Sequence, residues 1–412
     1  MNSRILLIAS SVSVFFALCA CVSPSPAPLP GPTATTVPPS SPTLEPTLPS
    51  PTATSIPPSP PTLDPTTSPA TEETPAPSLQ MIIPALSLRL AIPVEEEVTA
   101  ISPIPDGRLT LLTSDGRSDL LDIQTGEIEK GPVAPSRIEE LVFSPDGQVF
   151  ALRTKSEIRL WDVPEERTRF TLQIEEEVHR IAFSPQGTLL LVGGERSLAA
   201  YYTETGRQAF AFDLYGPANQ FVMTPDERLI FQMTEEDADL QIWDAHTGKR
   251  WGYFKFDPLT AIALSPDGYL LAAAENEMRL LEDEGYQAPF PTRLALWRVS
   301  VDPGQQKVIL NAQEELELQP ETEWGFPLSL KALAFTPDGQ YIVGLADWIG
   351  EGNMRARLYV WDATSGRMIG REVLPPRPRQ MALVEEGQAV AVLICSNFPC
   401  LEVRIYEINT GR

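Results

Sequence analysis

A short motif that recurs along the chain constrains its fold more than any other feature of the sequence. The motif is an apolar run that enters a Pro-Asp-Gly or related turn. Its seven copies are Ile101–Gly107, Leu141–Gly147, Ile181–Gly187, Phe221–Glu227, Ile262–Gly268, Leu333–Gly339 and Met381–Gly387. Successive copies end 40, 40, 40, 41, 71 and 48 residues apart. Proline fixes φ, aspartate bonds its own backbone and glycine supplies a positive φ, so each copy predicts a short buried strand that enters a tight turn.

A second motif follows each copy of the first. Its clearest examples are Trp161-Asp162, Trp243-Asp244 and Trp361-Asp362. Most copies then run into a Thr-Gly or Ser-Gly turn, as at Thr247-Gly248 and Ser365-Gly366. A period of about 40 residues with four short strands per unit is typical of propeller blades. The repeats therefore predict an all-β, seven-bladed β-propeller over residues 81–412.

The ends of the repeat array predict how the ring closes. An alternating stretch, Leu88–Val94, precedes the first repeat at the offset where Thr168–Ile174 forms the outer strand of its own blade. The last repeat, which contains Tyr406-Glu407, is one strand short. We expect the early strand to complete the last blade, because this pairing leaves no open edge between the first and last blades.

These motifs, their spacing and the shared last blade resemble WD-repeat (WD40) propellers over about residues 82–412. The resemblance implies a module that binds proteins or scaffolds an assembly. The Gly-His pair that usually opens each WD repeat is absent, so the family's His–Ser–Asp–Trp hydrogen-bond tetrad is not expected in its usual form. The tryptophans are assigned to packing between blades. They are Trp161, Trp243, Trp297 and Trp361.

The first residues predict export and a lipid anchor. Arg4 precedes an apolar run, Ile5–Leu18, which is shorter than the roughly 20 residues of a membrane span. A basic start and a small-residue end are typical of a signal peptide, here residues 1–20. The sequence Leu18-Cys19-Ala20-Cys21 resembles the bacterial lipobox, which implies that Cys21 is acylated, for example with palmitate, and becomes the mature N-terminus. We therefore expect an extracytoplasmic, membrane-anchored lipoprotein of the cell envelope.

A spacer is expected between the anchor and the propeller, over residues 21–80. Proline supplies 19 of the 59 residues from Val22 to Gln80, and Ser, Thr and Ala fill most of the rest. Such a composition cannot bury a core, so the segment is predicted to be disordered and extended.

Two cysteines near the C-terminus, Cys395 and Cys400, bracket Ser-Asn-Phe-Pro between two apolar strands. A four-residue hairpin loop can hold them opposite each other at disulfide distance. A pair of reduced thiols is the alternative, and export favours the bridge.

Composition narrows the classes of function. The formal net charge of −24 disfavours nucleic acid and anionic lipid surfaces as direct partners. We expect a monomer that binds one or more unidentified proteins, of which basic ones fit the acidic charge, without a cofactor, metal ion or catalytic residue. The two histidines, His179 and His246, lie in different blades and offer little for a catalytic triad. The alternative is a propeller-based enzyme or a sensor of a small ligand or cation, either of which needs titratable side chains in the central channel.

The long insertions predict where a partner binds. Alternate loops of a blade emerge on opposite faces, so Glu275–Thr292, Asn311–Ser329 and Asp347–Ala356 are expected on one sector of one face, in blades 5 and 6. The opposite face is expected to carry only short turns. Aromatic residues in loops on a rigid scaffold are typical of recognition surfaces, although they can instead pack the loops onto the blades. The candidate binding residues are Tyr286, Phe290, Trp324, Phe326 and Trp348.

Overall fold

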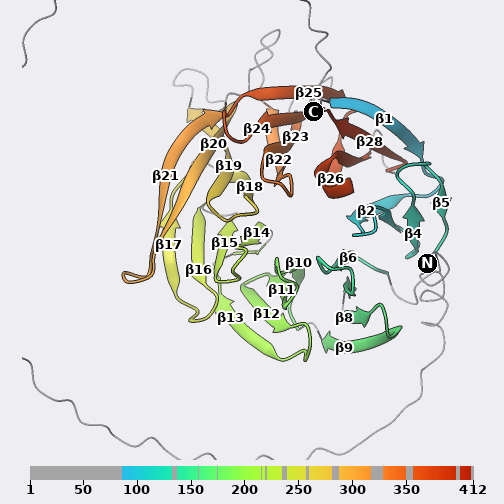
Figure 1. Ribbon diagram of the computed structural model, residues 1–412, viewed down its shortest axis with the longest axis horizontal. Helices are drawn as coiled ribbons and strands as arrows, with labels where there is room; N and C mark the ends of the chain where they lie inside the picture. Colours follow the sequence, from blue (N-terminus) through green and yellow to red (C-terminus); the bar gives the residue numbers. More distant parts are fainter. Residues whose placement is uncertain are drawn as a thin grey trace, which may run out of the picture. The chain divides into compact units, whose positions relative to one another are not determined.

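The computed structural model describes residues 86–131, 137–155, 157–173, 175–214, 216–218, 220–233, 239–256, 259–280, 287–316, 328–348, 356–395 and 400–409. Of residues 276–280, 287–292, 313–316, 328 and 348 it describes the backbone alone. The described strands form seven antiparallel sheets of four strands each, arranged as blades around a ring (Figure 1). The prediction of an all-β, seven-bladed propeller is therefore confirmed.

The blades follow one another along the chain. Blade 1 consists of β2 (Val98–Pro103), β3 (Leu109–Thr113), β4 (Ser118–Leu121) and β5 (Ile128–Glu129). Blade 2 consists of β6 (Glu140–Phe143), β7 (Val149–Arg153), β8 (Glu157–Asp162) and β9 (Arg167–Gln173). Blades 3 and 4 consist of β10 (Val178–Phe183), β11 (Leu189–Gly194), β12 (Ser197–Tyr202), β13 (Gln208–Asp213), and β14 (Gln220–Met223), β15 (Leu229–Met233), β16 (Leu240–Asp244), β17 (Arg250–Phe254).

The later blades have longer strands. Blades 5 and 6 consist of β18 (Leu259–Leu264), β19 (Leu270–Leu280), β20 (Gln287–Asp302), β21 (Lys307–Leu316), and β22 (Leu328–Phe335), β23 (Tyr341–Trp348), β24 (Ala356–Asp362), β25 (Met368–Leu374). Blade 7 consists of β26 (Pro378–Val384), β27 (Ala389–Ile394), β28 (Glu402–Ile408) and β1 (Leu86–Pro93), with the 3-10 turn η2 (Glu385–Gly387) after β26.

Antiparallel alternation gives the ring two faces. Connections from first to second and from third to fourth strands emerge on one face, which we call the turn face. Connections from second to third strands, and from one blade to the next, emerge on the opposite face, which we call the loop face. The first strand of each blade lies innermost, where it contacts the first strands of neighbouring blades (Figure 1).

The predicted closure of the ring is confirmed. Strand β1 pairs antiparallel with β28, in a register that runs from Leu86 opposite Ile408 to Pro93 opposite Glu402. The first described strand of the chain thus supplies the outermost strand of the last blade. Arg89 of β1 holds Glu385 of η2 at 2.8 Å and donates a further bond of 2.9 Å to the carbonyl of Ile123 in blade 1.

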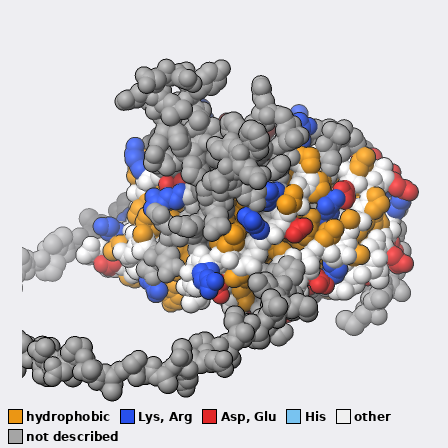
Figure 2. All heavy atoms as spheres, turned by 90° about the horizontal axis from the view of Figure 1, so that it is seen from above, with side chains coloured by type: hydrophobic (Ala, Val, Ile, Leu, Met, Phe, Trp, Pro, Cys, Tyr) orange, Lys and Arg blue, Asp and Glu red, His pale blue; other side chains and the backbone are white. Residues whose placement is uncertain are grey.

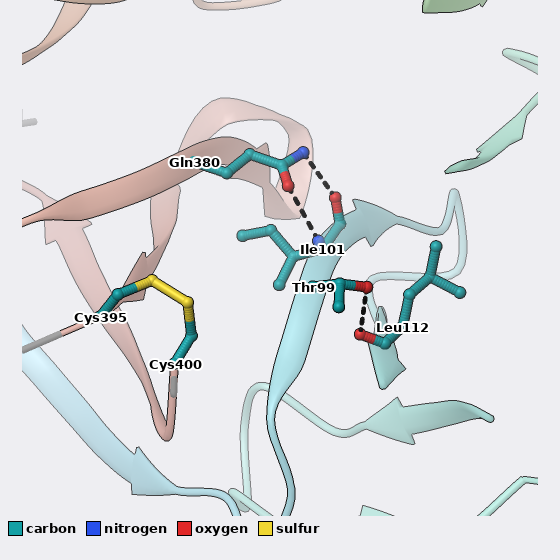
Figure 3. Close-up of a disulfide and its surroundings, with 6 residues drawn as sticks. All are labelled: Thr99, Ile101, Leu112, Gln380, Cys395 and Cys400. Atoms are coloured by element: carbon teal, nitrogen blue, oxygen red, sulfur yellow. Dashed lines mark hydrogen bonds between the residues drawn. A yellow bond between two sulfur atoms is a disulfide. The ribbon is translucent and has the colours of Figure 1, made fainter. Parts of the chain in front are cut away.

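Nearer the centre, backbone and side-chain bonds join blade 7 to blade 1. The N–H of Val94, just after β1, donates to the carbonyl of Leu401 at 2.9 Å and continues the pairing of β1 with β28. The N–H of Val98, which begins β2 of blade 1, donates to the carbonyl of Cys400 in blade 7 at 3.0 Å. Innermost, Gln380 accepts a bond from the N–H of Ile101 at 2.9 Å and donates one to its carbonyl at 2.8 Å (Figure 3). The side-chain amide of Gln380 therefore pairs with the open edge of β2 as a further strand would.

The Pro-Asp-Gly turns join consecutive blades on the turn face. In blade 2, Gly147 has a φ of 68°, and the Ser144 hydroxyl donates to Asp146 at 2.6 Å. A Cβ on Gly147 would lie only 3.2 Å from Pro105 in the turn of blade 1. The glycine of the motif is therefore needed both for its backbone conformation and for the close approach of the preceding blade.

The Thr-Gly turns meet the outer strand of the preceding blade in a similar way. Gly206 in blade 3 has a φ of 69°, and a Cβ there would lie 2.8 Å from the ring of Phe170 in β9. Gly126 in blade 1 is covered by Ile92 of β1. Because β1 covers its neighbour as other outer strands do, it replaces the missing strand in packing as well as in pairing.

The aspartate of each Trp-Asp motif holds the turn that follows it. Asp362 accepts bonds from the N–H of Thr364 at 3.1 Å and of Ser365 at 2.7 Å. The Ser365 N–H in particular lowers the pKa of Asp362, against the opposing effect of burial. Because of this lowered pKa, Asp362 stabilises the folded state at pH values above the ordinary pKa of a carboxyl group. This stabilisation is lost as pH falls through the lowered pKa.

Three of the four tryptophans, Trp243, Trp297 and Trp361, pack against clusters that join neighbouring blades, as predicted. Trp361 is fully buried in a cluster that joins blades 5 and 6, whereas Trp161 stacks on Phe150 of its own blade, with ring centroids 6.2 Å apart. The buried indole nitrogens of Trp161, Trp243, Trp297 and Trp361 have no hydrogen-bond partner in the described structure. This agrees with the expectation that the usual tetrad does not form.

Blade 5 departs from the expectation of short turns on the turn face. Strands β20 and β21 remain paired from Val299 opposite Leu310 to Asp302 opposite Lys307, beyond the position where the other blades turn. Val299 and Val308 pack into the core shared with blade 4, while Val301 and Ile309 are exposed. The sequence did not predict this longer hairpin, because the alternation of Val, Ser and Ile indicates a strand but does not show how far its pairing extends.

Substitutions at two glycines distinguish the cost of backbone strain from the cost of a clash between blades. Gly107 has a φ of 89° with nothing near its Cβ position, whereas Gly206 combines a positive φ with the contact to Phe170. We expect Gly107→Ala to lower the free energy of unfolding by about 1–2 kcal/mol. Gly206→Ala should cost about 1–3 kcal/mol more, because the methyl group overpacks the interface. Urea unfolding measures both, and equal losses would contradict the proposed role of the contact.

Candidate functional site

The three long insertions begin and end on the loop face in blades 5 and 6. Their flanking strand ends are Leu280 and Gln287, Leu316 and Leu328, and Trp348 and Ala356. The first and third insertions each join second and third strands, and the second joins blade 5 to blade 6. The strand order therefore brings all three to one sector of one face, as the sequence predicts.

The candidate aromatic residues remain predictions. Tyr286, Trp324 and Phe326 lie outside the described residues. Phe290 lies in β20 and Trp348 ends β23, and only the backbone of each is described.

Charged side chains are buried at the base of this sector. Glu275 in β19, Asp347 in β23 and Arg357 in β24 are 5%, 6% and 5% exposed. Lys331 Nζ lies 3.1 Å from Asp347 Oδ2. Burial of charge is costly unless the charge is paired, so such groups favour a specific arrangement over mere stability. The sequence reading missed this cluster, because its members lie in different strands of blades 5 and 6 and carry no shared motif.

A second feature of the loop face is a recurring β-bulge at the start of the innermost strands. In blade 2, for example, the N–H of Glu139 bonds the carbonyl of Arg153, and Glu140 also pairs with Arg153. Two residues thus oppose one, which re-aims the extra side chain. We call the six bulge residues of the described strands the collar: Thr99, Glu139, His179, Thr260, Lys331 and Arg379.

Most collar side chains are bonded within their own blades. Thr99 Oγ1 donates to the carbonyl of Leu112 at 3.1 Å (Figure 3). The other bonds join Thr260 to the carbonyl of Ala274 (3.4 Å), Glu139 to Arg153 (2.6 Å), His179 to Glu195 (2.7 Å) and Lys331 to Asp347 (3.1 Å). The collar therefore places titratable groups on the inner edge of the ring. The residue types at the collar differ from blade to blade, so no sequence motif predicts these positions.

The residue after the bulge joins neighbouring blades. Glu140 accepts a bond from the N–H of Ile181 at 3.0 Å, at the position that Gln380 holds beside Ile101. Burial raises the pKa of Glu140, against the lowering effects of Arg153, Arg180 and the Ile181 N–H. An ionised carboxylate at this position therefore stabilises the folded state less than an uncharged amide would.

The two histidines are far apart in the fold. His179 belongs to the collar, and His246 is exposed in the turn after β16, where its N–H donates to Asp244 at 3.1 Å. Among the described residues, no group of three or more His, Cys, Asp or Glu side chains could hold a metal ion. Cys395 and Cys400 form a disulfide beside the junction of blades 7 and 1 (Figure 3).

The surface charge is mixed. The edge of the propeller turned toward the viewer in Figure 2 carries basic and acidic side chains interspersed with hydrophobic ones. No helix in the described part of the chain has the length and apolar character needed to cross a membrane.

Seven four-stranded blades, a first strand shared with the last blade, and Pro-Asp-Gly and Trp-Asp turns define a WD40-like β-propeller. Over 173 residues the chain is 25% identical to the serine-threonine kinase receptor-associated protein of Gallus gallus. The match covers 40% of this chain and 49% of that protein, so the chain spans about half the length of this relative. No protein-family model matches the chain.

The raised pKa of Glu140 predicts a pH-dependent effect of one substitution. A raised folded-state pKa favours folding most below the ordinary value of 4.5, and this contribution is lost as pH rises through the folded-state value. Glu140→Gln should therefore become more stable relative to the wild type as pH rises from about 4 to 7. Urea unfolding at several pH values measures the difference.

The reciprocal substitution provides the control. Gln380→Glu places a carboxylate at the equivalent position of blade 7 and removes the donor to the Ile101 carbonyl, so this variant should lose stability relative to the wild type as pH rises. A Glu140→Gln difference that is constant or shrinks with rising pH would refute the assignment.

Proposed function

We propose that this protein is an extracytoplasmic protein-binding or scaffolding propeller of the cell envelope, which a lipid at Cys21 anchors to a membrane at the cell surface or the periplasmic face. The observation that carries the binding role is the convergence of three long insertions on one sector of the loop face, above the buried charges of Glu275, Asp347 and Arg357. A closed ring provides a rigid base for such loops. The Gallus gallus relative is named for its association with another protein, a serine-threonine kinase receptor, which supports the same role.

The insertions carry the chemistry expected of a binding surface. Tyr286, Phe290, Trp324, Phe326 and Trp348 are the aromatic anchors, and the acids between them would attract a basic protein. Glu282, Asp283 and Glu284 are examples of these acids.

The anchor proposal depends on the N-terminal sequence. The apolar run Ile5–Leu18 and the lipobox-like end at Cys21 are followed by a proline-rich spacer over residues 21–80. Two or more acyl chains suffice for stable attachment. The Cys395–Cys400 disulfide is compatible with an oxidising compartment outside the cytoplasm.

Trimming the insertions tests the binding role. We expect replacement of residues 281–286, 317–327 and 349–355 by short turns to abolish partner capture in crosslinking on intact cells, because it removes Tyr286, Trp324, Phe326 and the acids between them. The matched control shortens the blade 5 hairpin on the opposite face, at residues 303–306, and should capture the same partners as the wild type. Unchanged capture by the folded, loop-trimmed protein would refute the proposal.

Metabolic labelling tests the anchor. Cells that express the full chain and are fed an alkyne analogue of palmitate should yield a labelled, membrane-bound protein, because the thiol of Cys21 accepts the lipid. Cys21→Ala should lose the label and leave the membrane fraction, whereas Cys19→Ala should keep both. Labelling that survives Cys21→Ala would show that the anchor lies elsewhere or does not exist.

A further inference from the structure

Arginine side chains lie over aromatic rings on the outer rim of blades 3 and 4. Arg207 lies 5.6 Å from the ring centroid of Tyr202 in blade 3. Arg250, in blade 4, lies 5.2 Å from that of Tyr253 and 6.0 Å from that of Trp243. Within the described residues, the cation–aromatic contacts are confined to these two neighbouring blades.

Stacked rings connect the two blades. Phe210 and Phe212 of β13 stack with their centroids 4.8 Å apart, and Phe212 stacks on Trp243 of β16 at 5.3 Å. Trp243 in turn lies beneath Arg250. The arginine of blade 4 is therefore supported by an aromatic series that begins in the outer strand of the neighbouring blade 3.

The cations of this surface are available to a partner. Arg207, Lys249 and Arg250 are exposed, as are Tyr202 (40%) and Tyr253 (43%). Within the described structure none of these three cations has a carboxylate partner. Arg167, which occupies the corresponding turn of blade 2, is by contrast paired with Glu165 and has no aromatic ring beneath it in the described structure.

Stacking prepares an arginine to bind an anion. A guanidinium that lies flat on a ring loses side-chain freedom before the partner arrives, so less entropy is lost on binding. Its N–H groups point from the edge of the plane and remain free to hold a carboxylate with two parallel bonds. Arginine and tyrosine are also the residue types that dominate binding energy at protein interfaces.

We propose that the rim patch, defined as Tyr202, Arg207, Lys249, Arg250 and Tyr253, binds an acidic segment of a partner protein. The carboxylates of that segment take the N–H donors of Arg207 and Arg250. This inference rests on the proposed protein-binding function, but it concerns a surface separate from the insertions of the loop face, and it names the chemistry of the partner.

The charge of the whole chain favours a short acidic segment over a long polyanion. A net charge of −24 repels an extended polyanion or an anionic membrane, which would cover far more surface than these two blades. A short segment contacts mainly the local cations, although the carboxylate of Asp239 also lies at the patch, where it accepts a bond from the Tyr253 hydroxyl. Opposite charge across such a contact gives specificity and speeds association.

Fluorescence anisotropy with a labelled Glu-Gly repeat peptide tests the proposal on the full chain. The wild type should bind this peptide and not its Gln-Gly counterpart. Arg207→Gln combined with Arg250→Gln should weaken binding at least about tenfold, or 1.4 kcal/mol. The paired Lys substitutions keep the charges but lose the forked donors, so they should weaken binding by an intermediate factor. Arg167→Gln is the matched control and should stay within twofold of the wild type.

Three results would overturn the inference. One is equal binding of the Glu-Gly and Gln-Gly peptides, and another is a loss in Arg167→Gln as large as in the double variant. The third is stronger binding of polyphosphate or phosphatidylglycerol vesicles than of the peptide at equal anionic charge, which would assign the patch to polyanions or lipid. Thermal unfolding of each variant verifies its fold, and the Lys variants test the patch if the Gln pair does not fold. If the peptide does not bind, the proposed capture of a partner by the loop face still stands. If loop trimming does not affect capture, the proposed binding of the peptide by the rim patch still stands.

Discussion

The pairing of β1 with β28 is the interaction on which the rest of the structure depends. Each blade is stabilised by its neighbours, and only a closed ring gives every blade two of them. At the junction, seven backbone pairs join β1 to β28, Arg89 bridges Glu385 and Ile123, and Gln380 binds both backbone groups of Ile101. The Cys395–Cys400 disulfide lies in the same core cluster as Val94 and Val98. Outer edge, core and inner edge are thus all joined between segments that lie at opposite ends of the propeller sequence.

The same contacts recur around the ring in altered forms. Most turns place a glycine against the proline of the preceding blade. Blade 4 has Glu227 there instead, at a φ of 56°. Its carboxylate accepts bonds from the N–H of Gln186, at 2.9 Å, and from the Thr188 hydroxyl of blade 3. Hydrogen bonds thus replace the proline contact where the motif departs from its pattern. A scaffold that tolerates such exchange can carry different surfaces on different blades: insertions and buried charges in blades 5 and 6, and stacked arginines in blades 3 and 4.

The sequence predicts the features that follow from recurring residue types and misses those whose residue types vary from blade to blade. Seven blades, the shared last blade and the loop-face sector follow from motifs whose residue types serve the backbone itself, such as the positive φ of Gly147. The collar could not be predicted in this way, because a bulge can hold any residue type. Its members here include a threonine, Thr99, and an arginine, Arg379. The rim patch depends on the registration of Phe212 with Trp243 across two blades, which no local pattern encodes. The hairpin beyond Val299 is likewise set by pairing rather than by composition. Tyr286, Trp324 and Phe326 stay predictions, because they lie outside the described residues.

Amide hydrogen exchange over β1 tests ring closure most directly. If β1 completes blade 7, amides of Leu86–Pro93 that bond to β28 should exchange as slowly as those of β27, and both strands should open together as denaturant is raised. Peptides that span residues 86–93, 389–394 and 402–408, followed by mass spectrometry, report the three strands separately. Exchange of β1 at the rate of an unstructured chain, while β27 and β28 stay protected, would show that the ring does not close through this strand.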